Sequence, residues 1–128
     1  MVYQSSAAPH RPLSEPELDA VFGALAHPVR RAVLHEVASP DRPEAMTELA
    51  ERLDLSPQAL NKHLTTLERA RLITRVKQGR ATSAQANPEV LDSTRDWIVA
   101  MTDYWNTQLD SLQQYIESLH RKNEEGRN

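Results

Sequence analysis

Residues 46–72 constrain the fold more than any other part of the chain, because they contain two short amphipathic segments separated by a tight turn. The first segment is expected to begin a helix at Thr47 and the second at Ser56, since both residues are favourable N-caps. Pro57 then occupies the first helical position, where its missing N–H would have no partner within the helix. The stretch therefore predicts two consecutive helices joined by a short turn.

The second of these helices, predicted over residues 57–70, has two chemically different faces. At about 100° per residue, Leu60, Leu64 and Leu67 lie on one side. The opposite side carries amide, hydroxyl and cationic side chains, which are Gln58, Asn61, Lys62, Thr65 and Arg69. Groups of this kind bind base edges and phosphates. We therefore interpret residues 46–72 as a helix-turn-helix motif.

Charge is distributed unevenly along the chain, although the net charge is only −3. Residues 47–80 contain seven Lys and Arg against four Asp and Glu, a balance of +3. Residues 88–128 contain four against eight, a balance of −4. The positive balance favours binding of nucleic acid near the helix-turn-helix, and the acidic end is expected to lie away from it.

The spacing of apolar residues changes after the helix-turn-helix from a helical to an alternating pattern. Residues 72–77 alternate in polarity and include β-branched side chains, which predicts a strand. A turn with Gly79 follows, and residues 81–86 are expected to form the returning strand despite weak propensity. A hairpin over residues 73–86 in this place is typical of a wing. Lys77 and Arg80 near its tip are placed to reach phosphates or the minor groove, and for Arg80 a position in solvent is the alternative.

Two further helices are predicted upstream. Ser14 and Glu17 form a capping box that begins the first helix, and the pair His27-Pro28 separates it from the second. We expect Arg30 and Arg31 in the second helix to form ion pairs within the protein rather than to bind DNA. His63, on the flank of the helix over residues 57–70, is expected to be half-buried, with a phosphate contact as the alternative.

A long helix is predicted from Pro88 to about His120, on the order of 50 Å in length. Its apolar stripe is too long to be buried on one small core, so part of the stripe is expected to meet a second subunit. The predicted dimer contacts are Trp97, Ile98, Met101, Tyr104, Trp105, Leu109, Leu112 and Ile116. The alternative is that four of these side chains, Trp97, Met101, Tyr104 and Trp105, line an effector pocket.

The predicted fold is mainly α with a small β-hairpin wing. It consists of a disordered tail over residues 1–13, a winged helix-turn-helix domain over 14–87, a dimerisation helix over 88–120 and a second disordered tail over 121–128.

Several classes of protein are disfavoured by what the sequence lacks. It has no cysteine, which excludes disulfides, thiolate metal ligands and cysteine nucleophiles. No nucleophile motif or glycine-rich phosphate loop is present, so neither an enzyme nor a bound cofactor is expected. No apolar run has the length of a membrane span or of a signal peptide core, which predicts a soluble cytoplasmic protein.

The order of helices, helix-turn-helix, wing and long helix resembles that of the ArsR-type winged-helix repressors of bacteria. The blocks that carry this resemblance are residues 24–34 (ALAHPVRRAVL), 48–50 (ELA), 55–64 (LSPQALNKHL), 67–68 (LE), 72–73 (LI) and 79–80 (GR). The resemblance implies a homodimer whose second motif helix enters the major groove while the wing contacts the flanking DNA backbone. Pro57, Gln58, Asn61 and Lys62 match the base-facing positions of the family. The order of Pro57 and Gln58, and Asn61 where serine is common, depart from the family pattern, so no operator preference follows from the resemblance.

Many members of that family sense metals, either through cysteines in the first motif helix or through Asp and His residues of the C-terminal helix. Here residues 46–50 contain no cysteine, and the C-terminal helix contains one histidine, His120. The resemblance therefore implies the subgroup without metal-ligand motifs, and no metal site is expected.

The resulting hypothesis is a homodimeric bacterial repressor that binds a palindromic operator in double-stranded DNA. The residues expected to contact DNA are Thr47, Ser56, Pro57, Gln58, Asn61, Lys62, Thr65, Lys77 and Arg80. A small-molecule effector has no support beyond the aromatic residues of the long helix. The alternative hypothesis is a winged-helix protein-interaction module that uses the apolar C-terminal helix.

Overall fold

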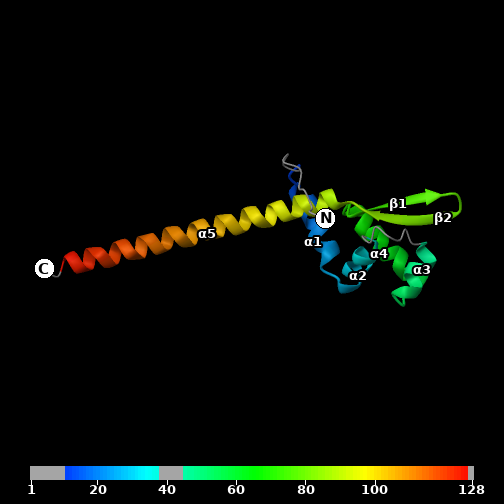
Figure 1. Ribbon diagram of the computed structural model, residues 1–128, viewed down its shortest axis with the longest axis horizontal. Coiled ribbons are helices and arrows are strands. Elements are labelled where there is room, and N and C mark those ends of the chain that lie inside the picture. Colours follow the sequence, from blue (N-terminus) through cyan, green and yellow to red (C-terminus); the bar gives the residue numbers. More distant parts are fainter. Residues whose placement is uncertain (1–10, 38–44, 127–128) are drawn as a thin grey trace, which may run out of the picture. The chain divides into compact units, whose positions relative to one another are not determined.

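The computed structural model describes residues 11–37 and 45–126, and it divides into two compact units, Met1–Thr94 and Arg95–Asn128 (Figure 1). Its elements are α1 (Glu15–Leu25), α2 (Pro28–Val37), α3 (Met46–Arg52), α4 (Pro57–Arg69), β1 (Ile73–Gln78), β2 (Ala81–Ala86) and α5 (Pro88–Glu125). The prediction of a mainly helical fold with one β-hairpin is confirmed. Of the two predicted tails, residues 1–10 and 127–128 lie outside the described residues.

Helix α1 begins with the predicted capping box. The Glu17 N–H donates to Ser14 Oγ over 3.3 Å, and the Ser14 N–H donates to Glu17 Oε1 over 3.1 Å. At the other end, α1 has no basic residue in its last turn. Instead Arg30 Nε donates to the Ala24 carbonyl over 2.9 Å and Arg31 Nη1 donates to the Leu25 carbonyl over 2.7 Å.

We expected Arg30 and Arg31 to form ion pairs within the protein, but both donate to backbone carbonyls of α1 instead. The last carbonyls of a helix lack partners within it and carry partial negative charge. The guanidinium groups of Arg30 and Arg31 on α2 donate hydrogen bonds to these carbonyls of α1. The two arginines therefore connect consecutive helices.

Helices α3 and α4 form the helix-turn-helix, but only α4 has a side-chain cap. Ser56 Oγ accepts from the Ala59 N–H over 3.1 Å, as predicted. Helix α3 begins two residues earlier than expected, with Ala45 in place of Thr47 at its N-cap and no side-chain cap bond. The prediction of Thr47 as that N-cap is therefore wrong, because Thr47 lies inside the helix.

The turn between α3 and α4 requires a left-handed residue, and Asp54 takes that conformation with φ of 54°. The Asp54 N–H donates to the Glu51 carbonyl and the Leu55 N–H to the Ala50 carbonyl. This pair of bonds is the Schellman arrangement that closes a helix C-terminus. Aspartate tolerates positive φ better than most non-glycine residues, which fits its place here.

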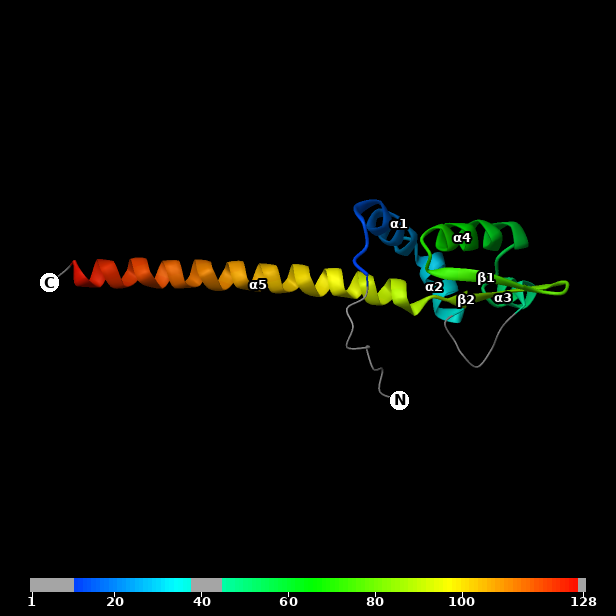
Figure 2. The ribbon, with the colours of Figure 1, turned by 90° about the horizontal axis from the view of Figure 1, so that it is seen from above.

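Helix α4 is central to the first unit, since it contacts α1, α2, α3 and β1 (Figure 2). Its three leucines, Leu60, Leu64 and Leu67, are at most 2% exposed. The other large side chains that are less than 2% exposed are Val21, Val33, Leu49, Leu72 and Ile73. The polar side of α4 is thereby turned away from the core.

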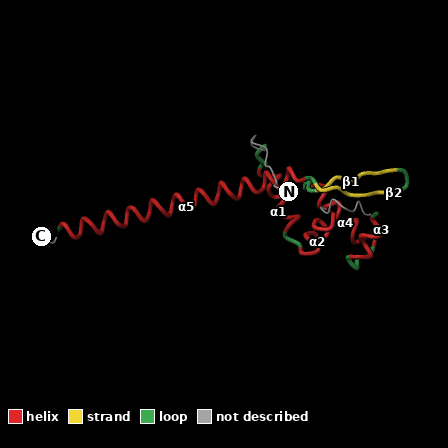
Figure 3. The backbone as a smooth tube through the Cα atoms, in the orientation of Figure 1, coloured by secondary structure: helices red, strands yellow, loops and turns green. Residues whose placement is uncertain are grey.

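The predicted wing is confirmed as an antiparallel hairpin that follows α4 closely (Figure 3). Gln78 pairs with Ala81, so Gly79 and Arg80 alone form the turn. Gly79 has φ of 60°, which a glycine adopts without steric cost.

Helix α5 extends to Glu125, five residues beyond the predicted end at His120. Asp92, Ser93 and Thr94 near its start are buried in the first unit. In the second unit the large apolar side chains are exposed, with Trp105 at 64% and Tyr115 at 62%. Among the described residues, no helix is both long and apolar enough to cross a membrane.

Candidate nucleic-acid interface

The polar side of α4 presents most of the residues that the sequence placed there. Gln58, Asn61 and Lys62 are exposed and Thr65 is half-buried. Because Leu60 and Leu64 hold the opposite side in the core, this orientation of α4 is set by packing. The helix therefore offers amide and ammonium groups to an external partner.

A hollow of about 530 Å³ brings together residues from α3, α4 and the hairpin. Three of the predicted DNA contacts line it, namely Thr47, Asn61 and Arg80. The remaining lining residues are Ala45, Met46, Arg75, Ala81 and Thr82. Lys77 is exposed on β1, where it pairs with Thr82 across the hairpin. The hollow thus joins Arg80 of the hairpin to the polar side of α4, and Lys77 lies across the hairpin from one of its lining residues, Thr82.

Arg75 was not among the predicted site residues, although its hydrogen bonds connect the hairpin to α4. Its Nη1 donates to Asn61 Oδ1 over 2.7 Å, and its Nη2 donates to Thr65 Oγ1 over 2.8 Å and to the Asn61 carbonyl over 3.2 Å. Its Nε lies 3.6 Å from Glu68 Oε1. Strand alternation contained a clue, since Arg75 is two residues from the buried Ile73 and so shares its face.

The hydroxyl of Thr65 already has hydrogen-bond partners within the protein. Its hydroxyl donates to the Asn61 carbonyl over 2.8 Å while it accepts from Arg75. A hydroxyl has one proton, so Thr65 has none left for a phosphate in this arrangement. Asn61 likewise has its side-chain oxygen engaged, so the exposed polar groups that α4 retains are the side chains of Gln58 and Lys62 and the amide nitrogen of Asn61.

His63 is half-buried on the flank of α4, as expected. Its ring centroid lies 4.9 Å from that of His27, which stands in the connection between α1 and α2. Burial lowers the pKa of His63, and the nearby His27 and Arg30 lower it further. His27 Nδ1 also accepts from the Val29 N–H over 3.1 Å, which satisfies a free donor at the start of α2.

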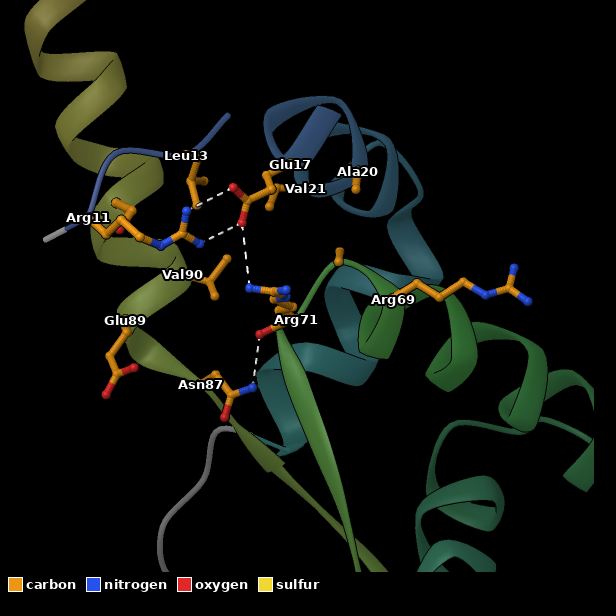
Figure 4. Close-up of a pocket in the computed structure, with 12 residues that line it drawn as sticks. Arg11, Leu13, Glu17, Ala20, Val21, Arg69, Arg71, Asn87, Glu89 and Val90 are labelled. Carbon is orange, nitrogen blue, oxygen red and sulfur yellow. Dashed lines mark hydrogen bonds and ion pairs between the residues drawn. The ribbon is translucent and has the colours of Figure 1, made fainter. Parts of the chain in front are cut away.

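The C-terminus of α4 borders a second cavity, of about 630 Å³, shown in Figure 4. Arg71 follows α4 with φ of 61°, and its carbonyl accepts from Asn87 Nδ2 over 2.9 Å. Its guanidinium lies 3.7 Å from Glu17 Oε2, whereas Arg69 points away from Glu17 (Figure 4). These contacts link the end of α4 to α1 and to the residue before α5.

Glu17 is held mainly by Arg11 at the edge of that cavity. Arg11 donates to both carboxylate oxygens, over 3.0 and 2.7 Å. Arg11 and then Ser14 lower the pKa of Glu17 to about 2. The carboxylate is thus ionised at neutral pH and already has cationic partners.

In the part of the chain that the structure describes, no three His, Cys, Asp or Glu side chains lie together as a group that could hold a metal ion.

The fold and this region match known transcriptional regulators. A helix-turn-helix domain model matches residues 25–76. The structure of an ArsR-like transcriptional regulator from Rhodococcus sp. RHA1 is 31% identical, with a TM-score of 0.70, over 77% of this chain and 92% of that one. This chain belongs to the ArsR family. The family consists of DNA-binding transcriptional regulators, which are not enzymes.

Other solved structures share this fold. A second ArsR-family regulator is 29% identical over 75% of this chain and 97% of its own, with a TM-score of 0.65. HlyU from Vibrio cholerae is 28% identical over 59% of this chain and 78% of its own, with a TM-score of 0.51. No curated protein matches the sequence of this ArsR-family member.

Proposed function

We propose that this ArsR-family regulator is a homodimeric repressor that binds a palindromic operator in the cytoplasm of a bacterium. Helix α4 enters the major groove, and the hairpin contacts the backbone beside it. The observation that carries the proposal is the exposure of Gln58 and Lys62 on the side of α4 opposite its buried leucines. A helix of this kind is suited to contact base edges from within the groove.

The charges around α4 support the same orientation. Lys62, Lys77 and Arg80 are exposed on α4 and the hairpin, where residues 47–80 have a balance of +3. Cations that neutralise phosphates release counterions, so affinity for DNA is expected to fall steeply with salt. Ser56 and Thr47 are exposed near the starts of α4 and α3 and are proposed as phosphate contacts, with Pro57 beside the backbone.

The homodimer rests on the second unit. From Trp97 to Leu119 the large apolar side chains of α5 are at least 39% exposed. An apolar helix face of this extent is stable in water when another surface covers it, and a second copy of the same face meets that need. The proposed contacts are those predicted: Trp97, Ile98, Met101, Tyr104, Trp105, Leu109, Leu112 and Ile116. Two copies of α4 related by a two-fold axis would then bind half-sites one or two helical turns apart.

The test is a binding titration of Lys62→Ala on DNA selected from a random pool by the wild-type protein. We expect its affinity to fall and its dependence on log salt to flatten by about one unit, because one phosphate contact is lost. Lys122→Ala is the matched control, since it removes the same charge from an exposed position on α5. Equal effects of the two variants would contradict the assignment of this face of α4.

A second candidate is a protein-interaction module, and the exposed apolar face of α5 is the observation that favours it. In that case α5 binds a different protein and the polar side of α4 has no DNA to contact. Failure of the wild-type protein to select any DNA, together with a monomeric state in solution, would favour this candidate.

A further inference from the structure

Arg75 directs its guanidinium into the protein rather than toward an external partner. A guanidinium has five N–H donors. Three of them bond Asn61 Oδ1, the Asn61 carbonyl and Thr65 Oγ1, and Nε faces Glu68. The Nε atom has almost no contact with solvent, and the whole side chain is 24% exposed. Arg75 therefore has little capacity left for a phosphate or a base.

These contacts determine how Asn61 presents its amide. A guanidinium cannot accept a hydrogen bond, so the atom of Asn61 that meets Arg75 must be the oxygen. The nitrogen, Nδ2, is on the other branch of the amide, and in the described part of the chain it has no bond to another residue. Asn61 itself is exposed on the polar side of α4. It therefore offers an N–H donor to whatever lies against this face.

This orientation has a consequence for base recognition. Asparagine binds adenine by two bonds, in which Oδ1 accepts from N6 and Nδ2 donates to N7. Arg75 takes one lone pair of Oδ1 and draws the oxygen toward the hairpin, which weakens a contact with adenine N6 and leaves the Nδ2 donor available. That donor is satisfied by N7 of either purine, by guanine O6 or by thymine O4, so the preference of asparagine for adenine is lost.

We propose that Arg75 is a positioning residue that determines operator specificity by holding Asn61 as a hydrogen-bond donor and so disfavouring its two-bond contact with adenine. The inference rests on the proposed function, since it requires that α4 faces DNA. Arg75 acts through Asn61 and Thr65 and does not itself contact a base.

The test uses selection of DNA from a random pool by the wild-type chain and four variants. Asn61→Ala identifies the operator position that Asn61 contacts, because discrimination among bases there is lost. Arg75→Met removes the donors and keeps the apolar stem. Arg75→Lys keeps the charge but carries it on a single nitrogen, which cannot reproduce the bonds that two separate guanidinium nitrogens make to Asn61 and Thr65. Lys77→Met is the matched control, since it removes the same charge from the same strand.

In the wild type we expect no preference for adenine over guanine or thymine at the position identified by Asn61→Ala. Arg75→Met and Arg75→Lys are each expected to shift that position toward adenine, on the order of tenfold in relative affinity, with other positions unchanged. Lys77→Met is expected to weaken binding to all sequences alike. Thermal melting of each variant shows whether it is folded, and if Arg75→Met is not, Arg75→Lys gives the decisive comparison.

Two outcomes overturn the inference alone. One is a uniform loss of affinity in both Arg75 variants, as for Lys77→Met, which would make Arg75 a phosphate contact. The other is a wild-type preference for adenine at the Asn61 position that the Arg75 variants leave unchanged. A wild-type protein that selects no sequence overturns the proposed function and this inference together, so the two failures are distinguishable.

Discussion

Helices α4 and α5 carry the same kind of apolar stripe, but only α4 has it buried by its own chain. Leu60, Leu64 and Leu67 are at most 2% exposed, whereas Leu109 and Leu112 on α5 are 59% and 54% exposed. Hydrophobic periodicity shows that one side of a helix needs a partner and does not show where that partner comes from. For α4 it is α1, α2, α3 and β1. For α5 beyond Thr94 we propose a second copy of the chain.

The strongest test of this comparison removes one leucine from each helix. Leu64→Ala leaves a cavity in the core and is expected to lower the free energy of unfolding by about 2–5 kcal/mol. Leu112→Ala removes the same atoms from an exposed position, and we expect a change within about 0.5 kcal/mol when the protein is too dilute to associate. Urea denaturation at low protein concentration measures both. Comparable losses would mean that α5 is covered by its own chain.

The partner of α5 is tested next by placing a charge in its stripe. Trp105→Asp is expected to raise the dissociation constant of the dimer by at least about thirtyfold, since buried tryptophans contribute roughly 2 kcal/mol or more at interfaces. Thr107→Asp adds the same charge about 200° around the helix and is expected to have little effect. Sedimentation velocity at micromolar concentration distinguishes dimer from monomer. If Trp105→Asp still forms a dimer, this part of α5 does not belong to the interface.

A smaller effect is expected at the starts of the two motif helices. Ser56→Ala removes the hydroxyl that caps α4 and is expected to cost about 1 kcal/mol. Thr47→Ala is the matched variant on α3, where the structure has no side-chain cap, and its cost is expected to be close to zero. Thermal melting of both variants gives the comparison. A larger loss for Thr47→Ala would mean that Thr47 stabilises α3 in a way other than capping.

The smallest expected effect is a dependence of the free energy of unfolding on pH, and it comes from His63 on α4. Because burial lowers the pKa of His63 below 6.5, the unfolded chain binds a proton there at higher pH than the folded chain does. The contribution of His63 to stability is therefore complete above pH 6.5 and declines as the pH falls through that value toward the lower folded pKa. His27 and Arg30, which face His63, oppose its protonation in the same direction.

The measurement is the free energy of unfolding of wild type and His63→Gln between pH 7.5 and about 5. We expect the difference between the two proteins to shrink as the pH falls, because only the wild type loses this contribution. Subtracting the variant removes the titration of carboxylates such as Glu17, whose pKa of about 2 places its own change at more acidic pH. A difference that stays constant across this range would contradict the role of His63.

Much of the local structure followed from short-range patterns. The capping box of Ser14 and Glu17, the cap at Ser56 and the turn at Gly79 were predicted because each depends on residues within three or four positions of one another. The expectation for Thr47 failed although it used the same rule. Threonine is compatible with several positions in the first turn, so its presence does not by itself define where α3 begins.

The candidate site could be predicted only in part. The polar side of α4 followed from the helical period, and the structure agrees with it for Gln58, Asn61 and Lys62. The contact of Arg75 with Asn61 could not be predicted, since the two residues are fourteen positions apart and meet only because the hairpin packs on α4. The bonds from Arg30 and Arg31 to α1 depend in the same way on how two helices pack.

The sequence by itself determined which segments are helix or strand, which side of each is apolar, and that the basic residues gather around α4 and the hairpin. These properties depend on periodicity and on neighbours along the chain. The tertiary structure alone decided which polar groups of α4 remain available. Arg75 engages the oxygen of Asn61 and the hydroxyl of Thr65, and leaves Gln58, Lys62 and the nitrogen of Asn61 for another molecule. The physical reason is that a hydrogen bond requires two groups within about 3 Å, and packing of separate elements sets that distance.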